Sequence, residues 1–200
     1  MTQAVAIIDS GGANIASLLY AFKRLDAPAV LTTDADTIRS ADRVILPGVG
    51  AAGDAMQRLR DAQLIDVIRG LTQPVLGVCL GMQLLVDASE EEDVECLGVI
   101  PGRAQKLPAS VDYPVPNMGW CAVQKRTDHA ALSSIADGSY FYFVHSYAVP
   151  VSDTTIATAT HVEPFAAVIA KDNFWAAQFH PERSSTAGQQ LLARFLKTAS

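Results

Sequence analysis

The stretch PVLGVCLGMQ, residues 74–83, passes from an apolar run straight into a helical pattern, with Cys79 at the junction. Glycines stand two positions before and two positions after the cysteine, which is the spacing of a nucleophile elbow with cysteine in place of serine. A sharp turn from strand to helix leaves little room for Cβ atoms, which explains Gly77 and Gly81. The pattern predicts a buried strand whose last residue, Cys79, presents its thiol at the carboxyl edge of a sheet.

The chain before and around this turn alternates short apolar runs with helical patterns. That alternation is typical of parallel β/α units, and nearly continuous apolar strands indicate a sheet covered on both faces. We expect an α/β fold with an open, mostly parallel central sheet and flanking helices. Strands are predicted at residues 4–8, 29–32, 44–46 and 75–79, and helices at residues 14–25, 53–68 and 80–88.

In the second half, turn residues separate short strands, which would add antiparallel strands to the sheet. A hairpin at Asp172-Asn173 would pair two of them. The Pro-rich stretch 108–116 is short enough to be a surface loop, and no long linker or repeat divides the chain, so we expect a single domain over residues 1–200. The strands are predicted at 97–100, 120–124, 140–149, 154–160, 166–170 and 175–179, before a closing helix at 188–197.

Composition disfavours several classes of protein. The net charge of −6 and the pI near 5.1 argue against binding to nucleic acid or to an anionic membrane. No basic segment precedes the first apolar run and no 18 apolar residues are uninterrupted, so we expect neither signal peptide nor membrane span, and a cytoplasmic location. Three scattered cysteines, Cys79, Cys96 and Cys121, suit neither a disulfide framework nor a CxxC metal site. We expect no metal and no cofactor.

Cys79 is the candidate nucleophile. Unpaired N–H groups and the macrodipole at a helix N-terminus favour thiolate over thiol, and the N–H of Leu80 is then one donor to an oxyanion. The alternative is a small buried cysteine in a packed turn. The flanking glycines favour the nucleophile, whereas Cys96 and Cys121 lack such a setting and are interpreted as structural.

The segment FHPE, residues 179–182, supplies a base and an orienting group. Pro181 biases His180 toward an extended backbone, so the side chains of His180 and Glu182 point to the same side. A cysteine–histidine pair needs a third group that fixes the imidazole tautomer, and a glutamate can fill that role. The catalytic candidates are therefore Cys79, His180 and Glu182.

The other histidines receive different interpretations. His129 and His161 are interpreted as structural or solvated. His145 lies on an aromatic strand that ends at the same sheet edge and has no acidic residue two positions away, so we predict a binding or interface role for it.

The segment GVGAAG, residues 48–53, literally matches the dinucleotide-binding pattern G-x-G-x-x-G. That pattern expects an acidic residue about 20 positions on, at the end of the next strand, but the next strand ends in Cys79. A nucleotide-binding dehydrogenase is thus disfavoured. A glycine loop beside the elbow can instead supply a second N–H to an oxyanion, and Val49 and Gly50 are the candidate donors.

Together these motifs resemble those of the class I, or triad, glutamine amidotransferases, which have a flavodoxin-like fold. The segments LPGVG (46–50), GVCLGMQLL (77–85) and FHPE (179–182) occur in that family's order at comparable spacing. Within the family, the chain is most similar to the glutaminase subunits of imidazole glycerol phosphate synthase. That similarity is carried by IIDSGGANIASL (7–18), LPGVGAAGDAM (46–56), NMGWCAV (117–123), YFYFVHSY (140–147) and QFHPERSS (178–185).

The resemblance implies hydrolysis of glutamine to glutamate and ammonia. Cys79 would attack the side-chain amide carbon and form a thioester, and His180 would protonate the departing ammonia and then activate water. The amides of Leu80 and Val49 would hold each oxyanion. The residues that the resemblance assigns to the glutamine pocket are Gly50, Gln83, His145, Ser146 and Tyr147.

The resemblance also implies a heterodimer with a (β/α)8-barrel cyclase, which would use the ammonia to make imidazole glycerol phosphate and an aminoimidazole ribotide (AICAR) in histidine biosynthesis. Asn117, Met118 and Trp120 are candidate docking residues, because Met and Trp are favoured at interface cores; the alternative is the buried start of a strand. At the positions of Cys121 and Ala51 in this chain, the family commonly has Asn and an aromatic residue. Docking to the cyclase, or coupling to it, can therefore differ in detail here.

Two other functions compete with this one. A related glutaminase could serve another synthase, although those for anthranilate or aminodeoxychorismate usually carry His where this chain has Met82. A non-catalytic scaffold with the same fold would have no need to keep all three triad positions.

Overall fold

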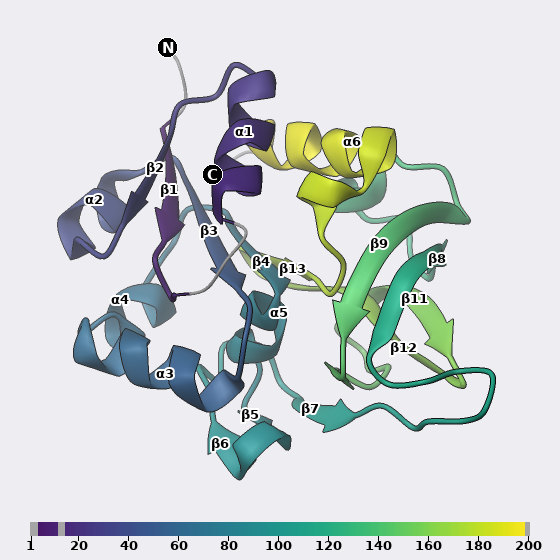
Figure 1. The fold of residues 1–200 in the computed structure, drawn as a ribbon. Coiled ribbons are helices and arrows are strands. Elements are labelled where there is room, and N and C mark those ends of the chain that lie inside the picture. The colour runs from purple at the N-terminus through teal and green to yellow at the C-terminus, as the bar shows by residue number, and fades with distance from the viewer. Residues whose placement is uncertain (1–3, 12–14, 199–200) are drawn as a thin grey trace.

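The computed structural model describes residues 4–11 and 15–198, and a nine-stranded sheet runs through its centre (Figure 1). Five neighbouring strands are parallel, and four more continue the sheet with antiparallel pairing. The expected fold class is therefore confirmed. In spatial order the strands are β2 (Ala29–Thr32), β1 (Val5–Ile8), β3 (Arg43–Gly48), β4 (Val75–Cys79), β13 (Phe174–Ala177), β12 (Glu163–Lys171), β11 (Thr155–His161), β8 (Asn117–Lys125) and β9 (Ser139–His145).

The inner parallel strands β1, β3, β4 and β13 contribute buried side chains to both faces of the sheet. In β1, Val5 and Ile7 pack on one side and Ala6 and Ile8 on the other. Because helices cover both faces, the residues of these inner strands are buried, which explains their continuous apolar runs, whereas the edge strand β2 is partly exposed. The first face is covered by α1 (Ile15–Arg24) and α6 (Ser185–Leu196), and the second by α2 (Ala35–Ser40), α3 (Ala52–Asp61), α4 (Ile65–Arg69) and α5 (Leu80–Leu85) (Figure 1).

A second, four-stranded sheet joins the segment that follows α5 to the segment that follows β9. The sequence pattern does not predict it, because strands of two to four residues are too short to show a period. Its order is β10 (Tyr147–Ala148), β7 (Arg103–Lys106), β5 (Ala88–Ser89) and β6 (Val94–Glu95), and the short 3₁₀ helices of the chain are η1 (Glu91–Asp93), η2 (Ala130–Leu132) and η3 (Pro181–Arg183).

The strand predicted at 97–100 is wrong. Its apolar residues are buried or half-buried, but their N–H groups do not pair with a strand. Leu97 N–H donates to Leu84 O at 2.8 Å, and Val99 N–H donates to Leu85 O at 3.0 Å. The segment therefore caps the carboxyl end of α5, whose last carbonyls need such donors.

Two predicted helices have different bounds. The helix expected over 53–68 is divided into α3 and α4 by a turn at Gln63, where φ is +57°. The helix expected over 80–88 ends at Leu85. The predicted start of the first helix at Asn14 lies outside the described residues. The strand expected over 140–149 is divided into β9 and β10, which belong to different sheets. The hairpin at Asp172-Asn173 is found between β12 and β13, and the remaining strands and the closing helix lie close to their predicted bounds.

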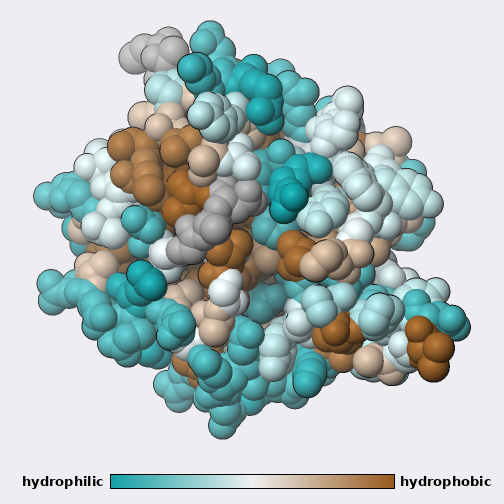
Figure 2. All heavy atoms as spheres, in the orientation of Figure 1, coloured by the Kyte–Doolittle hydropathy of each residue, from teal (hydrophilic) through white to brown (hydrophobic). Residues whose placement is uncertain are grey.

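The surface carries separate apolar groups. On the face in Figure 2, brown side chains gather near the edge strand β2, whose Val30 and Leu31 are exposed, and teal residues surround most other brown groups. Within the part of the chain that the structure describes, no helix has the length and apolar character that a membrane crossing requires.

Arg43 ties the last helix to the sheet. It begins β3 and is 3% exposed. Its guanidinium donates to the main-chain carbonyls of Phe195, Leu196 and Thr198 at the end of α6. Carbonyls in the last turn of a helix lack regular partners within the helix. The Phe195 carbonyl also accepts from Thr198 N–H. The side chain of Arg43 supplies donors to the carbonyls of Leu196 and Thr198.

We predict that Arg43→Met lowers the free energy of unfolding by about 1–3 kcal/mol, because methionine fills the space but removes the donors to the carbonyls of Leu196 and Thr198. Urea denaturation measures the change. Arg39→Met is the matched control: Arg39 pairs with Asp36 at 3.4 Å on the surface, and its loss should change stability by less than about 0.5 kcal/mol. An Arg43→Met protein as stable as the parent would contradict a stabilising role for the hydrogen bonds of Arg43.

Candidate active site

The turn from β4 to α5 places Cys79 in a strained backbone conformation, with φ +55° and ψ −112°. The turn lies directly against β3, the parallel neighbour of β4. A Cβ on Gly81 would lie 1.8 Å from the carbonyl oxygen of Leu46, and one on Gly77 would lie 2.9 Å from the carbonyl oxygen of Gly81. The two glycines are therefore required by the close approach of backbones, as the elbow spacing predicts.

His180 stands beside this turn because β13 pairs with β4 in parallel. Its main chain is fixed twice: its N–H donates to Tyr142 O at 2.9 Å, and its carbonyl accepts from the hydroxyl of Ser184 at 2.6 Å. Its ring nitrogen Nδ1 lies 2.9 Å from Oε1 of Glu182. The carboxylate thus fixes the proton on Nδ1 and leaves Nε2 for the thiol side of the ring.

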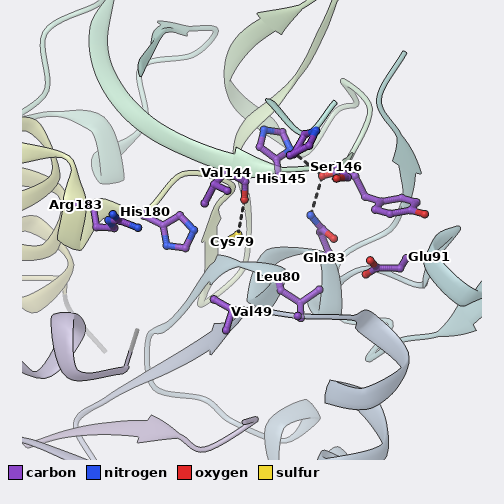
Figure 3. Close-up of a pocket in the computed structure, with 13 residues that line it drawn as sticks. Val49, Cys79, Leu80, Gln83, Glu91, Val144, His145, Ser146, His180 and Arg183 are labelled. Atoms are coloured by element: carbon purple, nitrogen blue, oxygen red, sulfur yellow. Dashed lines mark hydrogen bonds between the residues drawn. The ribbon is translucent and has the colours of Figure 1, made fainter. Parts of the chain in front are cut away.

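The surroundings of His180 favour the imidazolium form. Burial lowers its pKa, but the interaction with Cys79, the hydrogen bond to Glu182 and the charges of these two groups outweigh burial and raise the pKa to about 10. In Figure 3 the ring of His180 is directed toward Cys79. A thiolate beside an imidazolium is the nucleophilic form of such a pair.

His145 is held in the opposite state. Burial lowers its pKa to about 4, and its hydrogen bond to Tyr147 O opposes this only in part. Nδ1 lies 2.9 Å from Tyr147 O, and Nε2 lies 3.0 Å from Nδ2 of Asn117. Because a carbonyl only accepts, Nδ1 carries the proton and Nε2 accepts from the amide of Asn117. His145 is therefore a neutral, fixed group at pH 7.

A cavity of about 520 Å³ opens over the thiol (Figure 3). It brings together all the predicted pocket and oxyanion residues with Cys79 and His180, whereas Glu182 lies behind His180 and does not line it. Such a volume suits a small molecule the size of an amino acid. The predicted residues that line the cavity are Val49, Gly50, Cys79, Leu80, Gln83, His145, Ser146, Tyr147 and His180.

The glycine loop at 48–53 borders this cavity through Val49 and Gly50. Gly50 has φ +94°, a conformation that favours glycine. In a dinucleotide site the N-terminus of the following helix would face a pyrophosphate. Here the N–H of Ala52, the first residue of α3, donates to Glu91 Oε2 at 2.9 Å, so a carboxylate of the chain already lies at that helix start. The geometry therefore disfavours the dinucleotide interpretation.

Four further residues line the cavity that the sequence does not predict: Glu91, Pro116, Val144 and Arg183. Glu91 is one of four consecutive acidic residues at 90–93, and no spacing rule distinguishes it from its neighbours. Its pKa is raised by burial, against the effect of its hydrogen bond from Ala52. Its position depends on the small second sheet, which has no sequence signal.

The three docking candidates on β8 have different surroundings. Met118 is 64% exposed and Trp120 is 51% exposed. Asn117 is buried at 6%, and its side chain contacts His145 instead of the surface. Trp120 makes an edge contact with Tyr142, over whose ring the guanidinium of Arg183 lies at 4.8 Å. An aromatic contact therefore connects the exposed strand to the rim of the cavity.

The remaining cysteines and histidines lie away from the cavity lining. Cys96 is buried, and burial raises the pKa of its thiol to about 11, which agrees with a structural role. Cys121 lies 3.7 Å from Oδ1 of Asn117. His129 accepts from Ala131 N–H at the start of η2. His161 packs against the ring of Tyr113.

Comparison with known proteins places the chain in a family. The model of the class-I glutamine amidotransferases matches residues 6–199, so the chain belongs to this family. One relative, the imidazole glycerol phosphate synthase subunit HisH of Shewanella sediminis (strain HAW-EB3), is 48% identical over 199 residues, which cover 97% of this chain and 90% of the relative. The subunit of the same name from Pasteurella multocida (strain Pm70) is 49% identical over 195 residues, 98% of each chain. A crystal structure of a glutamine amidotransferase shares the fold, with a TM-score of 0.74 at 17% identity over 96% of this chain and 97% of that chain.

We predict that an NMR titration of the imidazole rings finds His180 protonated and His145 neutral at pH 7. Because the folded pKa of His180 lies above its unfolded value of about 6.5, the proton on His180 stabilises the fold fully below about pH 6.5. That contribution is lost as the pH rises through about 10. Glu182→Gln should lower the pKa of His180 and leave that of His145 unchanged. A midpoint near 6.5 for His180 in the parent would contradict the ion pair.

Proposed function

We propose that this chain is the glutaminase subunit of imidazole glycerol phosphate synthase and that Cys79, His180 and Glu182 are its catalytic triad. The observation that carries the proposal is the arrangement at the sheet edge, where a strained cysteine and a glutamate-held imidazolium border one small cavity. The relatives named for that synthase subunit, at 48% and 49% identity over nearly the whole chain, support the choice within the family.

The proposed reaction uses the thiolate as nucleophile. Cys79 attacks the side-chain amide carbon of glutamine, and the C–N bond breaks as His180 gives its proton to the nitrogen, which leaves as ammonia. Neutral His180 then takes a proton from water, the water oxygen attacks the thioester, and the C–S bond breaks to give glutamate and the thiolate. The N–H groups of Leu80 and of Val49 or Gly50 would hold the oxyanion in both steps; one such donor is typically worth about a hundred- to a thousandfold in rate.

The cavity has groups that suit the far end of glutamine. Glu91 is a partly buried carboxylate at the cavity wall, and the α-ammonium group of the substrate would offset the cost of its burial. Gln83 lines the cavity, and so do Ser146 and Tyr147, which follow His145 in the chain. These residues complete the proposed binding site. We take residues 1–200 as one glutaminase domain that needs no cofactor.

The proposed partner is a (β/α)8-barrel cyclase that binds the glutaminase as a heterodimer and consumes the ammonia. The exposed side chains of Met118 and Trp120 are the proposed docking residues, because large, flexible or aromatic side chains are favoured at interface cores. Asn117 would act from behind this surface, since it is buried. The cytoplasmic location expected from the sequence belongs to the same proposal.

Cys79→Ala should reduce glutamate release from glutamine by at least about a thousandfold, because no other group in the cavity can form the thioester. Cys96→Ala is the matched control and should keep activity, since Cys96 lies outside the cavity lining. Glutamate release is measured with the purified chain, alone and with a barrel cyclase and its ribonucleotide ligand. Retained activity in Cys79→Ala would contradict the mechanism.

The same assay separates the competing functions. Glutamate release that the cyclase strongly stimulates supports the proposed partner. Equal release with and without the cyclase would keep the triad but favour a glutaminase of another synthase. If no glutamate were released either with or without the cyclase, a non-catalytic scaffold would be favoured.

Trp120→Ala should weaken binding to the cyclase by about tenfold or more, as truncation of a central aromatic side chain does in other interfaces. Isothermal titration with the cyclase measures this change. Tyr20→Ala on α1 is the matched control, because Tyr20 is an aromatic residue of similar exposure, 63%, on another element. Equal binding by both variants would remove Trp120 from the docking surface.

A further inference from the structure

Two buried glutamines, Gln83 and Gln178, form a hydrogen-bonded pair beside the nucleophile. Gln83 is 4% exposed and Gln178 is fully buried. Nε2 of Gln83 lies 3.0 Å from Oε1 of Gln178, and Nε2 of Gln178 lies 3.8 Å from Sγ of Cys79. The reaction described above gives Gln178 no task, although it contacts the reacting sulfur.

The orientation of both amides follows from one main-chain carbonyl. Nε2 of Gln83 lies 2.8 Å from Tyr147 O, and because a carbonyl only accepts, the Gln83 amide must turn its NH₂ group toward it. The second N–H of that group then reaches the Gln178 oxygen. Gln178 is thereby left with its NH₂ group toward the sulfur. A flip of the Gln83 amide would bring two acceptors together, and a flip of the Gln178 amide would bring two NH₂ groups together.

The sulfur of Cys79 has contacts that favour different protonation states. Val144 O lies 3.8 Å from Sγ, and a carbonyl at this place stabilises the thiol, which can donate to it. The N–H of Gln178 stabilises the thiolate, which can only accept. The donor on Gln178 therefore offsets the carbonyl on Val144.

We propose that Gln178 is an additional catalytic residue that donates a hydrogen bond to the Cys79 thiolate, with Gln83 and the Tyr147 carbonyl fixing its amide. The inference rests on the proposed role of Cys79 as nucleophile. It also refines the role of Gln83: both of its N–H groups are used within the chain, so it can offer a substrate only its oxygen.

The test is the rate at which iodoacetamide alkylates Cys79, followed by mass spectrometry of the Cys79 peptide. Gln178→Met keeps the volume and removes the donor. At pH 7 its alkylation should be about tenfold slower than in the parent, since a hydrogen bond to a charged group is lost, and the difference should narrow at high pH. The charged groups that face the cavity, His180, Glu91 and Arg183, are unchanged in the variant. Glutamine turnover should show a lower kcat with an unchanged KM.

Gln57→Met is the matched control, because Gln57 is exposed on α3 and contacts only its own helix through Asp61 among the described residues. It should alkylate as the parent does. If circular dichroism finds Gln178→Met unfolded, Gln178→Glu keeps the shape and replaces the donor by an acceptor, and its alkylation at pH 7 should fall further.

An alkylation profile in a folded Gln178 variant that equals that of the parent would overturn the inference. Glutamate release by the parent separates this failure from a failure of the proposed function. Glutamate release by the parent, together with unchanged alkylation of Cys79 in the Gln178 variant, rejects only the role of Gln178. Slow alkylation in the variant together with a parent that releases no glutamate rejects only the glutaminase assignment.

Discussion

The contact between the Cys79 turn and the neighbouring strand β3 determines the geometry of the whole site. Gly81 lies so close to the carbonyl of Leu46 that no side chain fits between them. The resulting backbone angles of Cys79 are of a kind that costs about 1–3 kcal/mol and persists only where the surrounding structure fixes it. Packing between buried strands supplies that constraint. It also leaves the thiol no direction except outward, into the cavity.

Around that thiol, two buried histidines have opposite protonation states because their partners differ. His180 has a carboxylate and a thiol as partners, so it holds a proton in a buried place. His145 has a carbonyl and an amide as partners, which satisfy a neutral ring, and burial then removes its proton. The carbonyl of Tyr147 accepts from both His145 and Gln83, so hydrogen bonds converge on it from both sides. These hydrogen bonds fix the side chains of His145 and Gln83 but do not transfer a proton between them.

The sequence predicts the parts of the site that depend on local spacing. Gly77 and Gly81 around Cys79 indicate the turn, and the segment 179–182 places a base and an acid on one side of the chain. Glu91 and Gln178 depend on contacts between distant segments, and no periodicity identifies them. The segment 97–100 has the composition of a strand, but tertiary contacts use its N–H groups to cap α5, so propensity alone gives the wrong structure.

The pairing of β4 with β13 joins groups that are about a hundred residues apart in the chain. During synthesis on the ribosome, the thiol emerges before the imidazole and carboxylate that we propose activate it. A nascent or truncated chain that ends before β13 has a cysteine with no base. Under the proposed mechanism, the cysteine therefore gains its base only when β13 pairs with β4.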